Sequence, residues 1–175
     1  MKLLLAAGFA LPLLACAPEA RQAAATPNQA TRAELESADS TMEVSRSAAR
    51  QPAAGPIDWF TGRVTITPLF EPKGPSQVGA ALVRFEPGAR TAWHKHPLGQ
   101  RLVVLEGTGL TQVESGAIEL IHAGDVVWCP PDKRHWHGTT STGAMAHIAV
   151  QEAENGSPVE WMEQVPDQLY RAGPA

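Results

Sequence analysis

From Ile57 onward, short segments of apolar or alternating apolar and polar residues recur along the chain. Turn-forming sequences with Gly or Pro separate them, such as Glu86-Pro87-Gly88 and Ala123-Gly124-Asp125. Many short strands at this spacing are typical of a β-sandwich or barrel. We therefore predict an all-β fold with one short helical segment near Val159–Arg171. The predicted strands are Val64–Phe70, Val78–Phe85, Leu102–Leu105, Leu110–Val113, Ile118–Ile121, Val126–Cys129 and Ala146–Gln151.

The N-terminus has a different pattern. After Met1-Lys2, residues 3–14 are almost wholly apolar, which is too short for a membrane span but suits the apolar part of a signal peptide. The segment ends in Leu13-Leu14-Ala15-Cys16, which resembles a bacterial lipobox. We predict residues 1–16 to be a lipoprotein-type signal, with Cys16 lipidated and the protein attached to the periplasmic face of a membrane. Ordinary signal cleavage, giving a soluble periplasmic or secreted protein, is the alternative.

Residues 17–56 are rich in Ala, Pro, Gln, Ser and Thr and contain no aromatic side chain. Such a segment buries too little apolar surface to offset the entropy lost on ordering. We predict a disordered linker over residues 17–56 and one folded domain over residues 57–172. All five Trp of the chain fall in that domain, which is the size of a single hydrophobic core.

Charge and cysteine content narrow the possible functions. The chain of 175 residues has a net charge of −4, whereas a nucleic-acid-binding domain normally has a basic face, so we expect no nucleic-acid partner. Two cysteines are too few for a disulfide scaffold. With Cys16 lipidated, Cys129 has no partner in the chain, and we interpret it as a buried structural thiol.

Histidines form two pairs in the predicted barrel. His94 and His96 are two residues apart, and so are His135 and His137. Side chains at i and i+2 of a strand lie on the same face, so each pair can point into the barrel while Trp93 and Lys95 point outward. Because imidazole is the commonest metal ligand, two such pairs on separate strands predict a metal site. The isolated His122 is interpreted as an ordinary hydrogen-bonded residue.

The spacing of these residues resembles the cupin family. The segment Gly88-(x5)-His94-x-His96-(x3)-Gln100-(x6)-Gly107 is similar to the first cupin motif. The segment Gly124-(x5)-Pro130-x-Asp132-(x2)-His135 is similar to the second, although Asp132 stands where the family has Gly. The resemblance implies a double-stranded β-helix, the cupin jelly-roll barrel, preceded here by the disordered N-terminal tether. It also implies that the metal ligands are His94, His96, Gln100 and His135.

A narrower resemblance links the domain to small bacterial cupins with hydroxynitrile lyase activity. It rests on Asp58-Trp59-Phe60-Thr61-Gly62, on the segment from Phe85 to His94, on His96-Pro97-Leu98-Gly99-Gln100 and on His135-Trp136-His137-Gly138. These cupins are manganese proteins in which Gln replaces the usual Glu ligand, as Gln100 does here. The resemblance implies a lyase that cleaves a cyanohydrin to an aldehyde and cyanide.

A glutamine ligand changes the electrostatics of the predicted site. Three neutral imidazoles and a carbonyl oxygen leave the full charge on one divalent ion, which makes it a stronger Lewis acid than a site with Glu would. We expect manganese, although iron, zinc, nickel and cobalt also suit imidazole and carbonyl ligands.

The remaining residues on the inner strand faces give the predicted catalytic and pocket residues. His137 shares the inner face with His135 but lies outside the four-ligand motif, so we interpret it as the general base, with a supporting hydrogen-bond partner of the metal ligands as the alternative. His147 is predicted to help stabilise the departing cyanide. The predicted walls of the substrate pocket are Ala81, Val83, Phe85 and Gln151.

Two other functions and an assembly are consistent with the sequence. An oxygen-dependent metal dioxygenase acting on a small organic substrate is one alternative, and a non-catalytic envelope lipoprotein that binds a metal or small ligand is the other. The expected outward direction of Trp93, Trp136 and Trp128 favours a homo-oligomer. Arg90 and Arg101 are interpreted as solvated surface residues.

Overall fold

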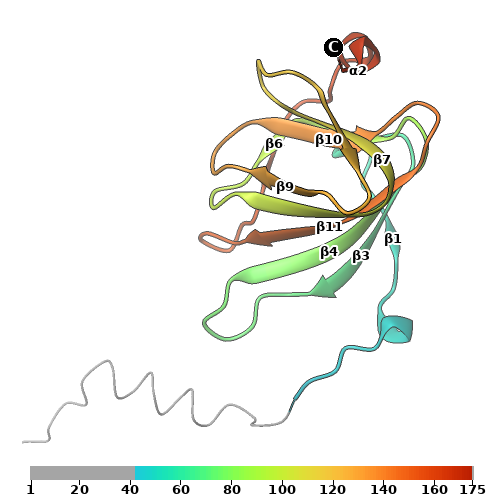
Figure 1. Cartoon of the computed structure of the whole chain (residues 1–175). Coiled ribbons are helices and arrows are strands. Elements are labelled where there is room, and N and C mark those ends of the chain that lie inside the picture. The colour runs from blue at the N-terminus through green and yellow to red at the C-terminus, as the bar shows by residue number, and fades with distance from the viewer. Residues whose placement is uncertain (1–41, 175) are drawn as a thin grey trace, which may run out of the picture. The chain divides into compact units, whose positions relative to one another are not determined.

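The computed structural model describes residues 42–174 (Figure 1). The predicted signal peptide, Cys16 and residues 17–41 of the predicted linker lie outside these described residues. No helix in the described part is long and apolar enough to cross a membrane. The strands, in chain order, are β1 (Ala53–Ala54), β2 (Phe60–Thr61), β3 (Val64–Phe70), β4 (Val78–Phe85), β5 (Arg90–Thr91), β6 (His94–Lys95), β7 (Gln100–Val113), β8 (Glu119–His122), β9 (Val126–Cys129), β10 (His135–Thr139), β11 (Met145–Glu152) and β12 (Glu160–Trp161).

Two antiparallel layers share the long strand β7. Its first half pairs with β9 on one side and with β11 on the other, and the sheet continues from β11 through β4 and β3 to β1. Its second half pairs with β8 and β10, and β10 also pairs with β5 and β6. Because β7 runs from one layer into the other, the sheet curls into a barrel (Figure 1). The predicted all-β jelly-roll fold is therefore confirmed.

The predicted turn at residues 106–109 is wrong. Instead of two strands joined by a turn, β7 is one strand of 14 residues that bends at Gly107, where φ is +75°. The register with β11 shifts between Ala146 and His147, which accommodates the bend. Glycine allows this left-handed backbone without leaving the strand, so a sequence typical of a turn instead lets β7 pass between the layers.

We predict that Gly107→Ala lowers the free energy of unfolding by about 2–4 kcal/mol. A Cβ atom at this position would have an unfavourable positive φ and would also collide with the carbonyl oxygen of Ala144. The matched control is Gly74→Ala, because Gly74 also has a positive φ but a Cβ atom there would have no other atom within 4 Å. Urea unfolding of both variants measures the difference, and equal losses would contradict the role given to the Ala144 contact.

Two segment boundaries differ from expectation. The helical segment α2 covers only Asp167–Ala172, and Glu160–Trp161 instead forms β12, which pairs with β6. Strand β1 falls within the predicted linker, where Ala53 and Ala54 pair with Ile66 and Thr65 of β3. Ordered structure therefore begins before Ile57, since the edge of β3 offers backbone hydrogen bonds to a segment with little apolar surface of its own.

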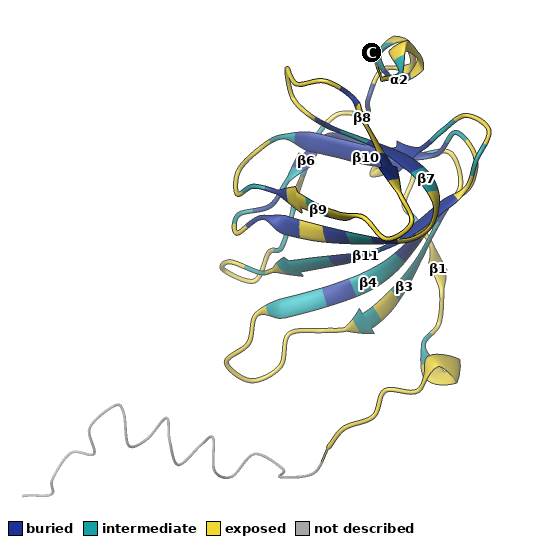
Figure 2. Ribbon diagram, in the orientation of Figure 1, coloured by how far each residue is buried: buried dark blue, intermediate teal, exposed yellow. Residues whose placement is uncertain are grey.

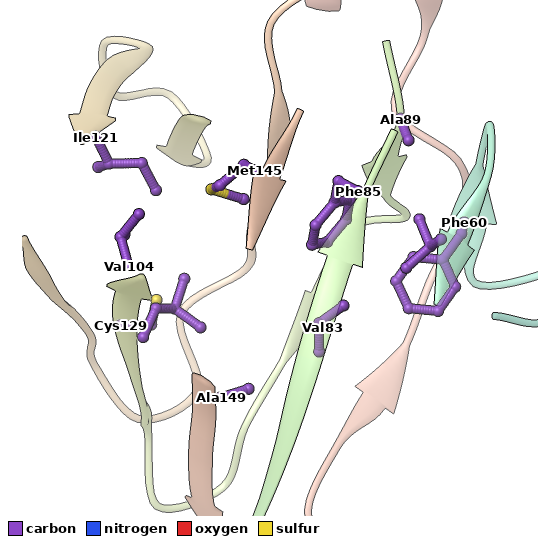
Figure 3. Packing of buried hydrophobic residues seen from close by; sticks show 11 residues of the cluster. Phe60, Val83, Phe85, Ala89, Val104, Ile121, Cys129, Met145 and Ala149 are labelled. Carbon is purple, nitrogen blue, oxygen red and sulfur yellow. The ribbon is translucent and has the colours of Figure 1, made fainter. Parts of the chain in front are cut away.

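The core lies between the two layers and is formed by alternate residues of the strands. On β4, Val83 and Phe85 are buried while Arg84 is exposed. Figure 3 shows Val83 and Phe85 packed beside Phe60, and Cys129 beside Val104 in the same cluster. Burial raises the pKa of the Cys129 thiol to about 12, so the thiol stays protonated, in agreement with its interpretation as a buried structural residue.

The expected exposure of Trp93, Trp136 and Arg90 is wrong. Trp136 is fully buried, and its Nε1 donates a hydrogen bond to Oε1 of Gln112 at 2.8 Å. Trp93 is buried as well, in the same cluster. Val165 and Tyr170 of the C-terminal residues cover this outer face of the barrel. Strand β10 is buried along its whole length, with His135 and His137 on its inner face and Trp136 under this cover (Figure 2).

Arg90 fastens the C-terminal segment to the barrel. Its guanidinium group donates hydrogen bonds to the carbonyl oxygen of Val165 and forms an ion pair with Asp167. Of the three tryptophans that suggested a homo-oligomer, only Trp128 is exposed, at 47%. The homo-oligomer stays a prediction, but Trp93 and Trp136 no longer support it.

Candidate metal centre

Several histidines from separate strands meet inside the barrel. His94 on β6 pairs directly with His135 on β10, and the centroids of their rings are 4.3 Å apart. The ring of His96 lies 5.2 Å from that of His94 and 5.6 Å from that of His135. All three side chains are almost completely buried. The predicted i, i+2 geometry of the two histidine pairs thus brings imidazoles of both pairs together.

Hydrogen bonds to the backbone fix the orientation of these three rings. In each ring Nδ1 bonds to a carbonyl oxygen: His94 to Ala92 at 3.0 Å, His96 to Pro158 at 2.6 Å and His135 to Lys133 at 2.8 Å. A carbonyl oxygen can only accept, so Nδ1 carries the proton and Nε2 carries a free lone pair. The Nε2 atoms of His96 and His135 are buried without a hydrogen-bond partner. Such oriented and unsatisfied lone pairs fit a metal ion.

Gln100 brings an oxygen to the same group. Its Nε2 donates a hydrogen bond to Oε1 of Gln151 at 3.3 Å, whereas its own Oε1 is buried without a partner. Gln151 therefore orients the amide of Gln100 so that the carbonyl oxygen remains free. The sequence placed Gln151 in the pocket, and this second role was missed because it depends on the distance between β7 and β11.

Burial keeps the imidazoles of the centre neutral. Loss of solvation is the main cause that lowers the pKa of each ring, and neighbouring histidines lower the pKa of His94, His96 and His137 further. The pKa falls to about 4 for His96 and for His147, and it is also lowered for His135. Neutral rings are the form that binds metals and accepts protons.

A compact group of His94, His135 and His137 could hold a metal ion, because each offers a ring nitrogen within 4.8 Å of the others. This group contains His137, whereas the predicted ligand set contains His96 and Gln100. The ring of His137 lies 5.1 Å from that of His94, about as close as the ring of His96. The four-residue ligand set therefore stays a prediction, and His137 lies near enough to serve either as a ligand or beside the metal.

His137 and His147 form a buried pair. Nδ1 of His137 and Nε2 of His147 are 3.2 Å apart, while Nε2 of His137 and Nδ1 of His147 have no partner. The ring of Phe85 packs against both imidazoles, at 5.9 Å and 5.5 Å between centroids. This contact between β10 and β11 joins the two residues predicted to be catalytic, and no local pattern in the sequence indicates it.

A cavity of about 130 Å³ lies beside the histidines. Three of the residues assigned to the substrate pocket from the sequence, Ala81, Val83 and Gln151, line this cavity. The fourth, Phe85, does not line it and packs against the imidazoles instead. Two aromatic walls, Phe60 and Trp161, were not assigned to the pocket from the sequence. Phe60 lies on β2 and Trp161 on β12, and only the closure of the barrel places them beside the histidines. The ring centroids of Trp161 and His94 are 4.7 Å apart.

A curled antiparallel barrel with a group of imidazoles buried on the inner faces of its strands is the arrangement typical of cupins. A family model described as "Cupin domain" matches residues 81–151, which include most of β4, the histidine-bearing strands and most of β11. The chain belongs to the cupin family, and within it to the small cupins that resemble hydroxynitrile lyases.

Two relatives carry this assignment. The chain is 55% identical over 130 residues to a protein of Granulicella tundricola named (R)-mandelonitrile lyase, covering 74% of this chain and 99% of the relative. It is 36% identical to a cupin-like protein of Thermotoga maritima of known structure, with a TM-score of 0.66 and coverage of 70% and 92% of the two chains. The polyketide cyclase RemF of Streptomyces resistomycificus shares the fold, with 18% identity, a TM-score of 0.60 and coverage of 75% and 92%.

Proposed function

We propose that this protein is a metal-dependent lyase that cleaves a cyanohydrin into an aldehyde and hydrogen cyanide. The observation that carries the proposal is the partnerless Nε2 of His137, buried beside a group of neutral histidines and next to a cavity. The 55% identity to a protein named (R)-mandelonitrile lyase supports the choice of reaction.

His94, His96, Gln100 and His135 would hold one divalent ion, which we propose to be manganese. The partnerless Nε2 atoms of His96 and His135 and the partnerless Oε1 of Gln100 fit such an ion. When bound, the ion would supply Lewis acidity that polarises the hydroxyl oxygen of the cyanohydrin and makes its proton easier to remove.

His137 acts as the base in this proposal. Its Nδ1 lies 3.2 Å from Nε2 of His147, and in our proposal the proton of this contact is held on Nδ1 of His137, which leaves the lone pair of its own Nε2 free to accept the hydroxyl proton. As the oxygen loses that proton, the carbonyl double bond forms and the carbon–carbon bond to the nitrile breaks, with its electron pair leaving on cyanide. The proton held by His137 then passes to cyanide, and hydrogen cyanide and the aldehyde depart.

His147 lies on the side of His137 that faces away from the accepting Nε2 atom, and it supports the proton transfer through the contact with Nδ1 of His137. Its ring faces Nδ1 of His137 and is itself fully buried, so it can share the positive charge that His137 gains when it accepts the proton. Burial lowers the pKa of His147 to about 4, so the ring is neutral at neutral pH and one of its two nitrogens can accept a hydrogen bond; in our proposal that nitrogen is Nε2. We therefore propose that His147 positions His137 in addition to its predicted role toward cyanide.

The experiment that tests the proposal is mandelonitrile cleavage by the full chain loaded with Mn(II), followed by the absorbance of released benzaldehyde. We expect release at least about a hundredfold above the rate without protein, and loss of that release after the metal is removed with a chelator.

Release at the uncatalysed rate by protein with bound metal would contradict the proposal. Oxygen uptake with small phenolic or diketone substrates would then favour the dioxygenase alternative. Metal retention without turnover of either substrate class would favour the binding protein.

A further inference from the structure

A second hollow, of about 330 Å³, lies next to the histidine cavity. Three side chains line both spaces: Ile66, Ala81 and Gln151. The second hollow is bounded by the connection between β3 and β4 and by residues 153–158 after β11, which lie at the same end of the sheet (Figure 1). The two spaces therefore adjoin at these three side chains, and we call the second one the outer hollow.

The walls of this outer hollow are largely apolar. Pro68 and Phe70 extend the face of β3 beyond Ile66, and Pro72 and Pro158 cover the sides. Phe70 is half-exposed, so this end of the hollow is open to solvent. Glu71 is the one charged side chain in the wall among the described residues. Such a surface suits an uncharged apolar group and disfavours an anionic one.

The inner cavity is too small for a whole aromatic cyanohydrin. An apolar protein cavity of about 150 Å³ holds one benzene molecule. The inner cavity, at about 130 Å³, must also accommodate the reacting carbon with its hydroxyl and nitrile groups beside His137. The outer hollow, which begins at Ala81 and Gln151, offers the space for a ring attached to that carbon.

We propose that the outer hollow binds the non-reacting part of the substrate, and that the preferred substrates carry bulky uncharged aryl or long alkyl groups. This inference rests on the proposed function, since it names the substrate class of the same site. In this inference, the residues of β3 and β4 that line the outer hollow, such as Pro68, Phe70 and Gly79, determine the specificity for large substituents.

Gly79 provides a way to fill the outer hollow without disturbing the strand. It lies on β4 two residues before Ala81, so a side chain there would point along the same face. A Cβ atom at Gly79 would make only ordinary contacts, 3.5 Å from Cδ of Pro72 and 3.6 Å from the carbonyl oxygen of Phe70. The variant Gly79→Leu should fold normally and occupy the hollow. Leu82→Phe adds bulk on the opposite face of β4 and is the matched control.

The test measures binding of two unreactive alcohols to the full chain loaded with Mn(II), by calorimetry. Benzyl alcohol places its single ring at the junction of the two spaces, beside Ala81 and Gln151, whereas para-phenoxybenzyl alcohol extends its second ring along the outer hollow past Gly79. We expect the longer alcohol to bind at least about tenfold more tightly, because its second ring buries more apolar surface. Gly79→Leu should weaken binding of the longer alcohol about tenfold and change that of benzyl alcohol less than about twofold, while Leu82→Phe should change neither.

Equal binding of the two alcohols, no detectable binding of the longer one, or no effect of Gly79→Leu would overturn the inference. Neither alcohol can release cyanide, so the result is independent of turnover. If the protein cleaves mandelonitrile but binds both alcohols equally, the proposed function is supported and the outer subsite is contradicted. If the protein binds the longer alcohol selectively but does not cleave mandelonitrile, the outer subsite is supported and the proposed reaction is contradicted.

Discussion

Replacement of His137 by alanine is expected to lower the rate of mandelonitrile cleavage by about two to four orders of magnitude while the bound metal stays in place. Loss of a positioned general base has an effect of this size. The Nε2 atom of His137 is the buried proton acceptor beside the cavity in our proposal, and His147 already occupies its other ring nitrogen. Benzaldehyde release and metal content, measured on the same preparation, check both parts of the expectation.

Metal content distinguishes the two roles open to His137. The group His94, His135 and His137 also has the spacing of a metal site, so His137 can be a ligand on geometry alone. If His137→Ala loses the metal together with activity, the assignment as base is wrong and His137 is a ligand. His122→Ala is the matched control, because His122 is exposed on β8 outside this group and should change neither measurement.

Replacement of His135 is expected to abolish metal binding and with it activity. His135 is fully buried, its ring is fixed by the carbonyl oxygen of Lys133, and its Nε2 is buried without a hydrogen-bond partner. We expect the metal content of His135→Ala to fall from about one ion per chain to below about a tenth. Cleavage should fall at least about a thousandfold, because the remaining histidines cannot supply the Lewis acidity.

A folding defect would imitate this result, so stability is measured in parallel. Added Mn(II) should raise the midpoint of thermal unfolding of the wild-type chain, since a ligand that binds only the folded state stabilises it. His135→Leu keeps a side chain of similar size without a ligand atom and should stay folded by circular dichroism, yet show no such rise. A folded variant that retains both metal and activity would contradict the ligand assignment of His135.

Most strands could be predicted because their pattern is local. The bounds of β3, β4 and β9 match the predicted segments, and each is set by apolar residues ended by Gly or Pro turns. The bend in β7 could not be predicted. A sequence with two glycines is typical of a turn, and only the contact of Gly107 with the start of β11 shows that the strand continues.

The histidine pairs were predictable for the same reason. Side chains two residues apart on a strand lie on the same face, and the two motifs that contain these pairs have the spacing of a known family. The sequence thereby indicated which imidazoles gather in the barrel. The walls contributed by Phe60 and Trp161 were not predictable, since each lies on a two-residue strand whose position depends on its pairing with β5 or β6.

The sequence by itself determined the class of fold, the set of histidines and the presence of Gln100 among them, because strand alternation and motif spacing act over a few residues. Only the tertiary structure decided that Trp136 is buried under the C-terminal segment, that His147 faces His137 and that Gln151 orients Gln100. These contacts join separate strands, and a distance between strands is set by how the barrel closes. Local sequence shows which face a side chain takes, whereas barrel closure decides what lies opposite it.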